Sequence, residues 1–176
     1  YDDPDWNTLL DQLTFNEMVK TITLGFHNTA AVESIGKTAT KDENGPQGLT
    51  AKLTGGISGM CYTSEDVMAA TFNTDLINDV GRCIGEDCLS LGFSGLYGPG
   101  INMHRTAYSG RNFEYFSSDP FVAGTIVAAE VQGIQSKGVY VYLKHVALND
   151  SESSRRGVNT WLNEQTAREI YLEVAD

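Results

Sequence analysis

Polar and charged side chains able to do chemistry gather in three stretches of the sequence, 42–49, 102–120 and 144–155. Each stretch mixes carboxylates with amides or cationic groups, the first two also contain glycine, and the second adds aromatic residues. Arginine and carboxylate groups hold neighbouring hydroxyls through paired hydrogen bonds, while aromatic faces pack against a sugar ring. The composition of these stretches therefore suits carbohydrate binding, although composition alone decides the role of none of them.

Several of these residues also have a structural interpretation. Arg111 and Glu114 lie three positions apart, and we expect an ion pair that braces a loop rather than a catalytic role. Asp119 precedes Pro120, an arrangement typical of the cap and first position of a helix. His104 has no partner that its spacing identifies, so we expect it to be packed or solvent-facing.

The overall composition describes an acidic folded chain. Its 176 residues include 12 Lys and Arg against 23 Asp and Glu, for a net charge of −11. A phosphate backbone would be repelled, so we expect no nucleic-acid partner. No uncharged apolar run is long enough for a membrane span. The three cysteines lack the even count of a disulfide framework and the spacing of a zinc site, so we expect no metal and no cofactor.

Local signals predict the first two helices. Thr14 and Glu17 have the spacing of a capping box, and apolar residues follow at helical intervals over 15–22. Asn73 or its neighbour is expected to cap a second helix that ends at Gly92. The buried stripe of this second helix is expected to comprise Leu76, Val80, Ile84 and Leu91.

The second half of the chain predicts an alternation of strands and helices. A short buried strand is expected over 93–96, a third helix over 120–137, a strand over 139–143, and a last helix from about Asn163. This order is that of an α/β fold. Lys144 follows the 139–143 strand directly, and the carboxyl ends of strands are where α/β barrels place their functional residues.

Five short motifs follow one another along three quarters of the chain. They are NGPQG at 44–48, YGPGIN at 97–102, GRNFEY with a following SDP at 110–120, the strand that ends in Lys144 and His145, and REIYL at 168–172. Together they resemble the N-terminal barrel of glycoside hydrolase family 3. Each motif alone is weakly specific, whereas their common order is highly specific. The family usually has Asp in place of Asn44 and Glu in place of Ser118.

The resemblance implies a partial (β/α)8 TIM barrel, of which this chain would supply the first half. It also implies the activity of a retaining β-glucosidase, β-xylosidase or related enzyme, and the chain resembles the glucosidase branch rather than the N-acetylglucosaminidase branch. By the resemblance, the hydroxyls of the sugar in the −1 subsite would be bound by Asn44, Arg105, Lys144, His145 and Arg155. Asn44 keeps an acceptor but loses the charge-assisted hydrogen bond of the usual Asp.

Retaining hydrolysis needs two carboxyl groups about 5 Å apart. The resemblance implies that the nucleophile, an Asp in a Ser-Asp-Trp-like motif, follows REIYL, and that the acid/base comes from a later domain. We therefore expect residues 1–176 to form a single truncated barrel domain, inactive alone, because a full barrel takes about 250 residues. Its open strand edges and apolar face favour self-association or pairing with the rest of the barrel.

Two other functions stay open at this point. A non-catalytic carbohydrate-binding or regulatory half-barrel module would carry the same sugar-binding residues. A different small α/β enzyme would use Asp150 and Glu152 as its carboxylate pair, but residues two apart share a face only on a strand, and 149–156 has the composition of a loop. The sequence leaves the sugar, the linkage and the compartment, cytoplasmic or secreted, undecided, while the resemblance favours a microbial source.

Overall fold

The computed structural model describes residues 2–51 and 55–176 and divides the chain into two compact units, Tyr1–Asp42 and Glu43–Asp176. The first unit comprises α1 (Asp5–Leu10), α2 (Phe15–Thr23), β1 (Asn28–Thr29), a 3-10 turn (Glu33–Ile35) and the start of β2 (Thr40–Asn44). Helix α2 begins with the predicted capping box. The Thr14 hydroxyl accepts from the backbone N–H of Glu17, and the Glu17 carboxylate accepts from the backbone N–H of Thr14 at 2.8 Å.

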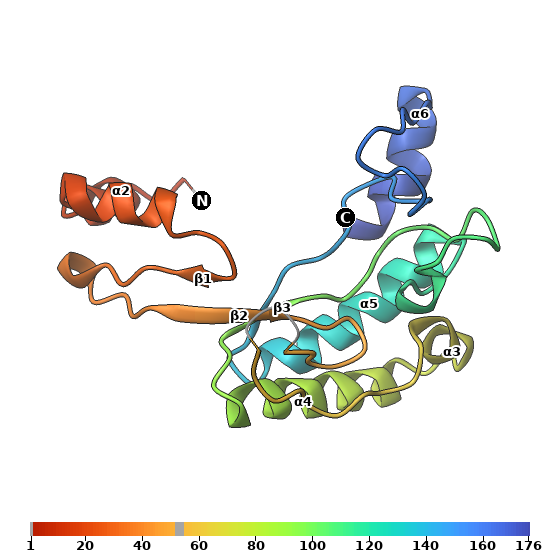
Figure 1. Ribbon diagram of the computed structural model, residues 1–176, viewed down its shortest axis with the longest axis horizontal. Coiled ribbons are helices and arrows are strands. Elements are labelled where there is room, and N and C mark those ends of the chain that lie inside the picture. Colours follow the sequence, from red (N-terminus) through yellow and green to blue (C-terminus); the bar gives the residue numbers. More distant parts are fainter. Residues whose placement is uncertain (1, 52–54) are drawn as a thin grey trace. The chain divides into compact units, whose positions relative to one another are not determined.

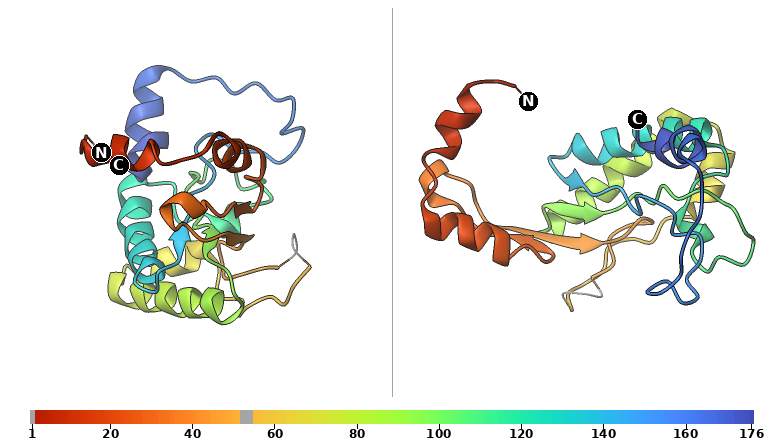
Figure 2. Two further views of the ribbon diagram at one scale, coloured as in Figure 1. Left: turned by 90° about the vertical axis from the view of Figure 1, so that its left-hand side faces the viewer. Right: turned by 90° about the horizontal axis from the view of Figure 1, so that it is seen from above.

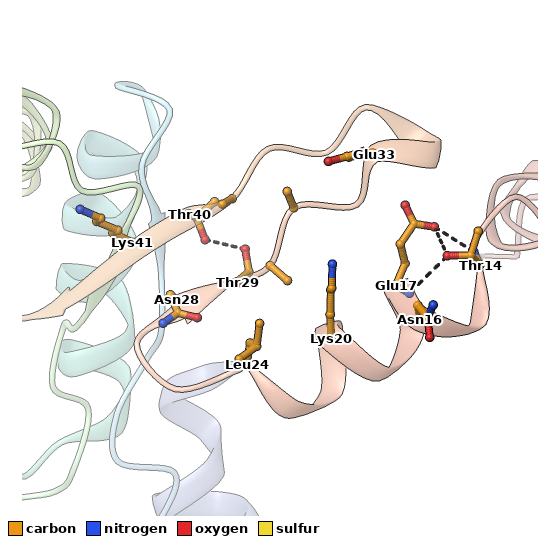
Figure 3. Close-up of a pocket in the computed structure, with 13 residues that line it drawn as sticks. Thr14, Asn16, Glu17, Lys20, Leu24, Asn28, Thr29, Glu33, Thr40 and Lys41 are labelled. Atoms are coloured by element: carbon orange, nitrogen blue, oxygen red, sulfur yellow. Dashed lines mark hydrogen bonds between the residues drawn. The ribbon is translucent and has the colours of Figure 1, made fainter.

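Strands β1 and β2 of the first unit form an antiparallel hairpin, with Asn28 opposite Lys41 and Thr29 opposite Thr40. A hollow of about 790 Å³ lies between this hairpin and α2. Figure 3 shows the mixed charges on its walls, with Glu17 and Lys20 on the helix and Lys41 on the hairpin. The predicted helix over 15–22 is confirmed as α2, whereas the pairing of β1 with β2 was not predicted.

The second unit alternates helices and short strands. Its elements are α3 (Glu65–Ala70), α4 (Thr74–Ser90), β3 (Gly95–Tyr97), a 3-10 turn (Asn112–Glu114), α5 (Pro120–Gln135), β4 (Tyr140–Val141), α6 (Glu164–Thr166), a π-helical turn (Ala167–Leu172) and a 3-10 turn (Glu173–Ala175). Strands β3 and β4 are parallel, with Gly95 opposite Tyr140 and Leu96 opposite Val141, and α5 provides the connection between them. This unit therefore contains the β-α-β order that the sequence predicted.

Side-chain caps start the long helices where the sequence predicted them. The Asn73 carboxamide accepts from the backbone N–H of Leu76 at 3.1 Å. The Asp119 carboxylate accepts from the backbone N–H of Val122 at 3.0 Å, with Pro120 at the first helical position. Asn163 caps the last helical segment in the same way. The structural interpretation of Asp119 as a cap is thus confirmed.

Helices α4 and α5 lie side by side along their length (Figure 1). Glycines permit this approach: a Cβ atom on Gly81 would lie 2.2 Å from the carbonyl oxygen of Glu130, and one on Gly133 would lie 2.2 Å from that of Asn78. The predicted buried stripe of α4 is partly wrong, because the side chain of Leu76 is 48% exposed. The buried positions of α4 are instead Ile77, Gly81, Ile84, Gly85 and Cys88.

The predicted strand over 139–143 is shorter than expected, since regular pairing is limited to Tyr140–Val141. Hydrogen bonds to the neighbouring segment nevertheless continue: the N–H of Lys144 donates to the carbonyl of Pro99, and the N–H of Ile101 donates to the carbonyl of Lys144. Pro99 has no N–H, so it interrupts the ladder. The chain thus remains extended as far as Lys144. Among the described helices, none combines the length and apolarity that a membrane span requires.

Candidate functional site

Lys144 lies at the carboxyl end of the extended segment that continues β4. Its ammonium donates a 2.6 Å hydrogen bond to Oδ1 of Asn44, the last residue of β2. It also lies 3.5 Å from Oε2 of Glu114. Gly45, which follows Asn44 directly, donates its N–H to the carbonyl of Tyr97 at the end of β3. Polar groups thus converge where three strand segments end, the location that barrel folds use for function.

Burial lowers the pKa of Lys144, and the neighbouring Glu114 carboxylate acts in the opposite direction. The side chain of Lys144 is 13% exposed, so its charge depends on the groups around it rather than on bulk water. Glu114, which is 4% exposed, supplies the compensating negative charge. This buried ion pair is the electrostatic centre of the site.

An ion-pair network extends from Glu114 across the site. Arg111 donates from Nε to Glu114, and its Nη1 lies 3.6 Å from Oε1 of Glu152. Glu152 in turn accepts from Arg155 at 3.1 Å. The predicted ion pair of Arg111 and Glu114 is confirmed, but it is more than a loop brace, because it contacts Lys144 directly.

His145 is held by three polar contacts to two neighbours, Asn102 and Tyr115. Its backbone N–H donates to Oδ1 of Asn102 at 2.8 Å, and its ring Nδ1 lies 3.1 Å from the same oxygen and 3.1 Å from the hydroxyl of Tyr115. Asn149 donates to the Tyr115 hydroxyl and to Glu152, which joins His145 to the ion-pair network. Burial, followed by the charges of Arg111 and Lys144, lowers the pKa of His145 to about 4, so the ring is neutral near pH 7.

Arg105 lies in a separate cluster. Its Nε donates to the hydroxyl of Tyr171 at 3.0 Å, and its guanidinium carbon lies 5.1 Å from the centre of that ring. Tyr171 donates to Asp150 at 3.3 Å, and burial raises the pKa of the Asp150 carboxyl. Within the described ranges, no hydrogen bond or ion pair joins Arg105 to Lys144 or Glu114.

The structure brings together four of the five residues that the sequence predicted to bind a sugar. Asn44 and Lys144 are in direct contact, His145 is adjacent, and Arg155 is reached through Glu152. The prediction omitted Asn102, Glu114 and Tyr115, although all three lie within the quoted motifs at 97–102 and 110–115. Their contacts join positions far apart in the chain, so spacing alone did not assign them roles.

Other residues singled out in the sequence have structural partners. His104 donates from Nε2 to the carbonyl of Asn112 at 2.8 Å. Asp150 and Glu152 lie in a loop, as expected, and have different partners, so they do not form a paired carboxylate site. The long loop between β4 and α6 is visible in Figure 2. In residues 2–51 and 55–176, no three His, Cys, Asp or Glu side chains are grouped to hold a metal ion.

The hollow of the first unit is unrelated to these residues, because every residue that lines it belongs to 14–41. The polar network described above lies wholly in the second unit.

Comparison with known proteins assigns the family. The profile described as the glycosyl hydrolase family 3 N terminal domain matches residues 13–174. The chain belongs to glycosyl hydrolase family 3. The family resemblance carried by the five motifs is thereby confirmed.

Curated and solved family 3 proteins align along nearly all of this chain. Thermostable beta-glucosidase B of Acetivibrio thermocellus is 35% identical over 96% of the chain and 23% of its own length. Beta-glucosidase 3B of Thermotoga neapolitana, solved with α-D-glucose, has a TM-score of 0.82 and 32% identity over 97% of the chain and 27% of its own. The Kluyveromyces marxianus beta-glucosidase, solved with glucose, has a TM-score of 0.87 and 32% identity. The alignment covers 96% of this chain and 21% of the Kluyveromyces enzyme.

These alignments confirm the predicted fold class. The second unit has the parallel strand pair and the flanking helices of an α/β fold, and the structural neighbours are family 3 (β/α)8 barrel enzymes. The chain spans about a fifth to a quarter of the length of the relatives it matches. It is therefore similar to one part of the barrel-containing β-glucosidases.

Proposed function

We propose that the second unit carries part of the −1 sugar-binding subsite of a retaining β-glycosidase of the β-glucosidase type. In this proposal, the residues that bind sugar hydroxyls are Asn44, Arg105, Lys144, His145 and Arg155. The observation that carries it is the convergence of Lys144, Asn44 and Glu114 at the ends of adjacent strand segments. Support comes from relatives that are named beta-glucosidases, two of which were solved with glucose.

The proposed chemistry follows from the hydrogen-bonding capacity of each group. The Lys144 ammonium has three donors, of which Asn44 and Glu114 engage two, so a third can serve a sugar oxygen. The carboxamide of Asn44 accepts through Oδ1 and keeps its NH₂ group as a donor. Charged donors beside a partly buried surface form stronger hydrogen bonds than neutral ones, which favours a ligand that presents several hydroxyl oxygens.

We add Arg111 to the proposed sugar-binding residues. Its guanidinium lies in the Lys144 and Glu114 network, and its side chain is 19% exposed. It has five N–H donors, and its contacts to Glu114 and Glu152 leave donors for a ligand. Arg105 donates from Nε to the hydroxyl of Tyr171, so in this proposal its remaining N–H groups serve the sugar.

The proposal places the nucleophile and the acid/base outside the 176 residues. Glu114 is held between Arg111 and Lys144, and Glu152 lies between Arg111 and Arg155. A carboxylate engaged by two cations is a weak nucleophile and a poor proton donor. These two carboxylates therefore orient cationic side chains in this proposal, and the chain alone binds a sugar without cleaving it.

The test measures binding and hydrolysis separately. Titration calorimetry with glucose is expected to detect binding by the 176-residue chain, and Lys144→Gln is expected to weaken it at least about tenfold, equivalent to about 1.4 kcal/mol. Lys137→Gln is the matched control. Lys137 pairs with Glu86 on helix α4, and this ion pair includes none of the proposed sugar-binding residues. Equal affinity for wild type and Lys144→Gln would contradict the proposed subsite.

Hydrolysis is measured with a panel of aryl β-glycosides. We expect no turnover by the chain alone. Turnover would place a catalytic carboxylate within this chain, and Asp42, Asp150 and Glu152 would be the first positions to substitute. Binding without turnover by a complete gene product would favour the non-catalytic carbohydrate-binding module instead.

A further inference from the structure

We propose that Asn102 is a positioning residue that fixes the proton of the neutral His145 ring on Nδ1, so that Nε2 presents a lone pair to the ligand. One consequence, that His145 accepts a hydrogen bond from a sugar hydroxyl, rests on the proposed function. The tautomer itself rests only on contacts within the second unit.

The orientation of the Asn102 carboxamide is fixed by the backbone of His145. Its oxygen and nitrogen have similar shapes, so their positions must be inferred from their partners. The backbone N–H of His145 is an obligatory donor and lies 2.8 Å from the amide atom assigned as Oδ1. Only the oxygen can accept there. Because Asn102 is 3% exposed, its side chain has little freedom to turn away.

This orientation constrains the imidazole in turn. Nδ1 of His145 lies 3.1 Å from the same Oδ1. If Nδ1 were unprotonated, its lone pair would face the oxygen lone pairs in a buried environment, which is unfavourable. A proton on Nδ1 converts the contact into a second hydrogen bond to Oδ1. Since a neutral imidazole carries one proton, Nε2 is then an acceptor.

Tyr115 is the competing influence on the ring. Its hydroxyl lies 3.1 Å from Nδ1 and would stabilise the other tautomer by donating to an unprotonated Nδ1. The same hydroxyl already accepts from Asn149 at 3.2 Å, so it can also serve as an acceptor for the Nδ1 proton. The backbone constraint on Asn102 has no such freedom, because a peptide N–H cannot accept. Asn102 therefore determines the tautomer, and Tyr115 adapts to it.

His145 remains neutral in this environment, which makes the tautomer meaningful near pH 7. Burial, with the positive charges of Arg111 and Lys144, lowers its pKa to about 4, whereas the negative charges of Glu114 and Glu152 act in the opposite direction. A neutral ring beside the Lys144 ammonium gives the site one strong donor and one acceptor on adjacent residues. A sugar hydroxyl that donates to Nε2 can accept from Lys144 through its own oxygen.

The test is the nitrogen NMR spectrum of the histidine rings in the 176-residue chain, without ligand. Long-range ¹H–¹⁵N correlations distinguish a protonated ring nitrogen from an unprotonated one, and a His145→Gln variant assigns the signals that disappear. We expect the Nδ1–H tautomer at His145. His104 is an internal control of opposite sign, because it donates from Nε2 to the carbonyl of Asn112. Finding the Nε2–H tautomer at His145 would overturn the inference.

Two variants separate the influence of Asn102 from that of Tyr115. Asn102→Leu is expected to move the His145 proton to Nε2, because the Tyr115 hydroxyl then donates to Nδ1. Tyr115→Phe is expected to leave the proton on Nδ1. The opposite pattern, with only Tyr115→Phe changing the tautomer, would overturn the assignment to Asn102.

Asn102→Asp provides a further test in case Asn102→Leu does not fold. Asn102→Asp keeps an oxygen for both donors and adds a negative charge, so we expect the Nδ1–H tautomer and a pKa of His145 raised by about one unit or more. An unchanged pKa would contradict the contact. Glucose binding is read separately by calorimetry: an Nδ1–H tautomer in a chain that does not bind glucose counts against the proposed function alone.

Discussion

The Nζ atom of Lys144 donates a 2.6 Å hydrogen bond to Oδ1 of Asn44, a residue one hundred positions earlier in the chain. This contact joins the end of β2 to the segment that follows β4. Because Asn44 is neutral, Glu114 provides the negative charge in contact with the Lys144 ammonium. The charge balance of the proposed subsite therefore depends on the residue type at position 44.

Asn44→Asp is expected to strengthen glucose binding about fivefold. A carboxylate forms charge-assisted hydrogen bonds that exceed neutral ones by about 1 kcal/mol, and it raises the pKa of the Lys144 ammonium. Calorimetric titration with glucose measures the effect. Asn28→Asp adds the same charge to the first unit and is the control, with no expected change in affinity. Weaker binding by Asn44→Asp would show that the neutral amide is preferred at this position.

Glu114→Gln is expected to lower the free energy of unfolding by about 3 kcal/mol. The substitution leaves the partly buried charges of Arg111 and Lys144 without their common carboxylate, and uncompensated buried charge is strongly destabilising. Urea unfolding at neutral pH measures the change. Glu86→Gln removes the exposed partner of Lys137 and is expected to change stability by less than about 1 kcal/mol. Equal effects of the two substitutions would mean that the Glu114 network contributes no more than a surface ion pair.

The helix starts were predictable because their signals are local. Thr14 with Glu17, Asn73, and Asp119 before Pro120 each provide a cap within three residues of the N–H that they satisfy. The buried face of α4 was less predictable, because apolar periodicity counts leucine and ignores glycine. Gly81 is buried against Glu130 of α5, and Gly85 is buried against the C-terminal end of that helix. Leu76, by contrast, is exposed.

The sequence motifs located the polar groups of the candidate site but did not indicate their contacts. The motifs at 97–102 and 110–115 indicated where the polar groups lie, and the resemblance implied a role for Lys144. The sequence did not indicate that Glu114 contacts Lys144 or that Arg105 packs on Tyr171, since these pairs are 30 and 66 positions apart. Contacts of that separation depend on the strand order and on the close approach of loops, which the chain's periodicity does not encode.

Gly81→Ala is expected to destabilise the second unit by about 1–3 kcal/mol, the usual cost of overpacking. A Cβ atom at this position would lie 2.2 Å from the carbonyl oxygen of Glu130, so α4 and α5 must separate to admit it. The matched control is Gly157→Ala, because no atom lies within 4 Å of a Cβ atom built there. Thermal unfolding followed by circular dichroism compares the two. A Gly81→Ala chain as stable as Gly157→Ala would contradict close packing of these helices.

Glu130→Gln is expected to flatten the pH dependence of stability. Glu130 is fully buried on α5, and neither carboxyl oxygen has a hydrogen-bond partner among the residues described. Burial raises its pKa from 4.5 to about 8, and it lies near Glu65, whose pKa is also raised, first by burial and then by the charge of Glu130. The folded chain therefore holds a proton on Glu130 that the unfolded chain releases above about pH 4.5.

The sign follows from this difference. The stabilisation is fully present below the unfolded pKa of 4.5, declines as the pH rises, and is lost once the pH passes the folded pKa of about 8. One proton contributes a slope of at most about 1.4 kcal/mol per pH unit. Urea unfolding at a series of pH values across this window should show a shallower decline for Glu130→Gln, with the other groups whose pKa is shifted, among them Glu65, Asp150 and His145, responsible for the remaining pH dependence. Glu17→Gln is the control, since hydrogen bonds to backbone N–H groups lower the pKa of Glu17 to about 2, so its contribution is lost only under more acidic conditions. A slope that Glu130→Gln leaves unchanged would show that the Glu130 carboxyl is ionised in the folded chain.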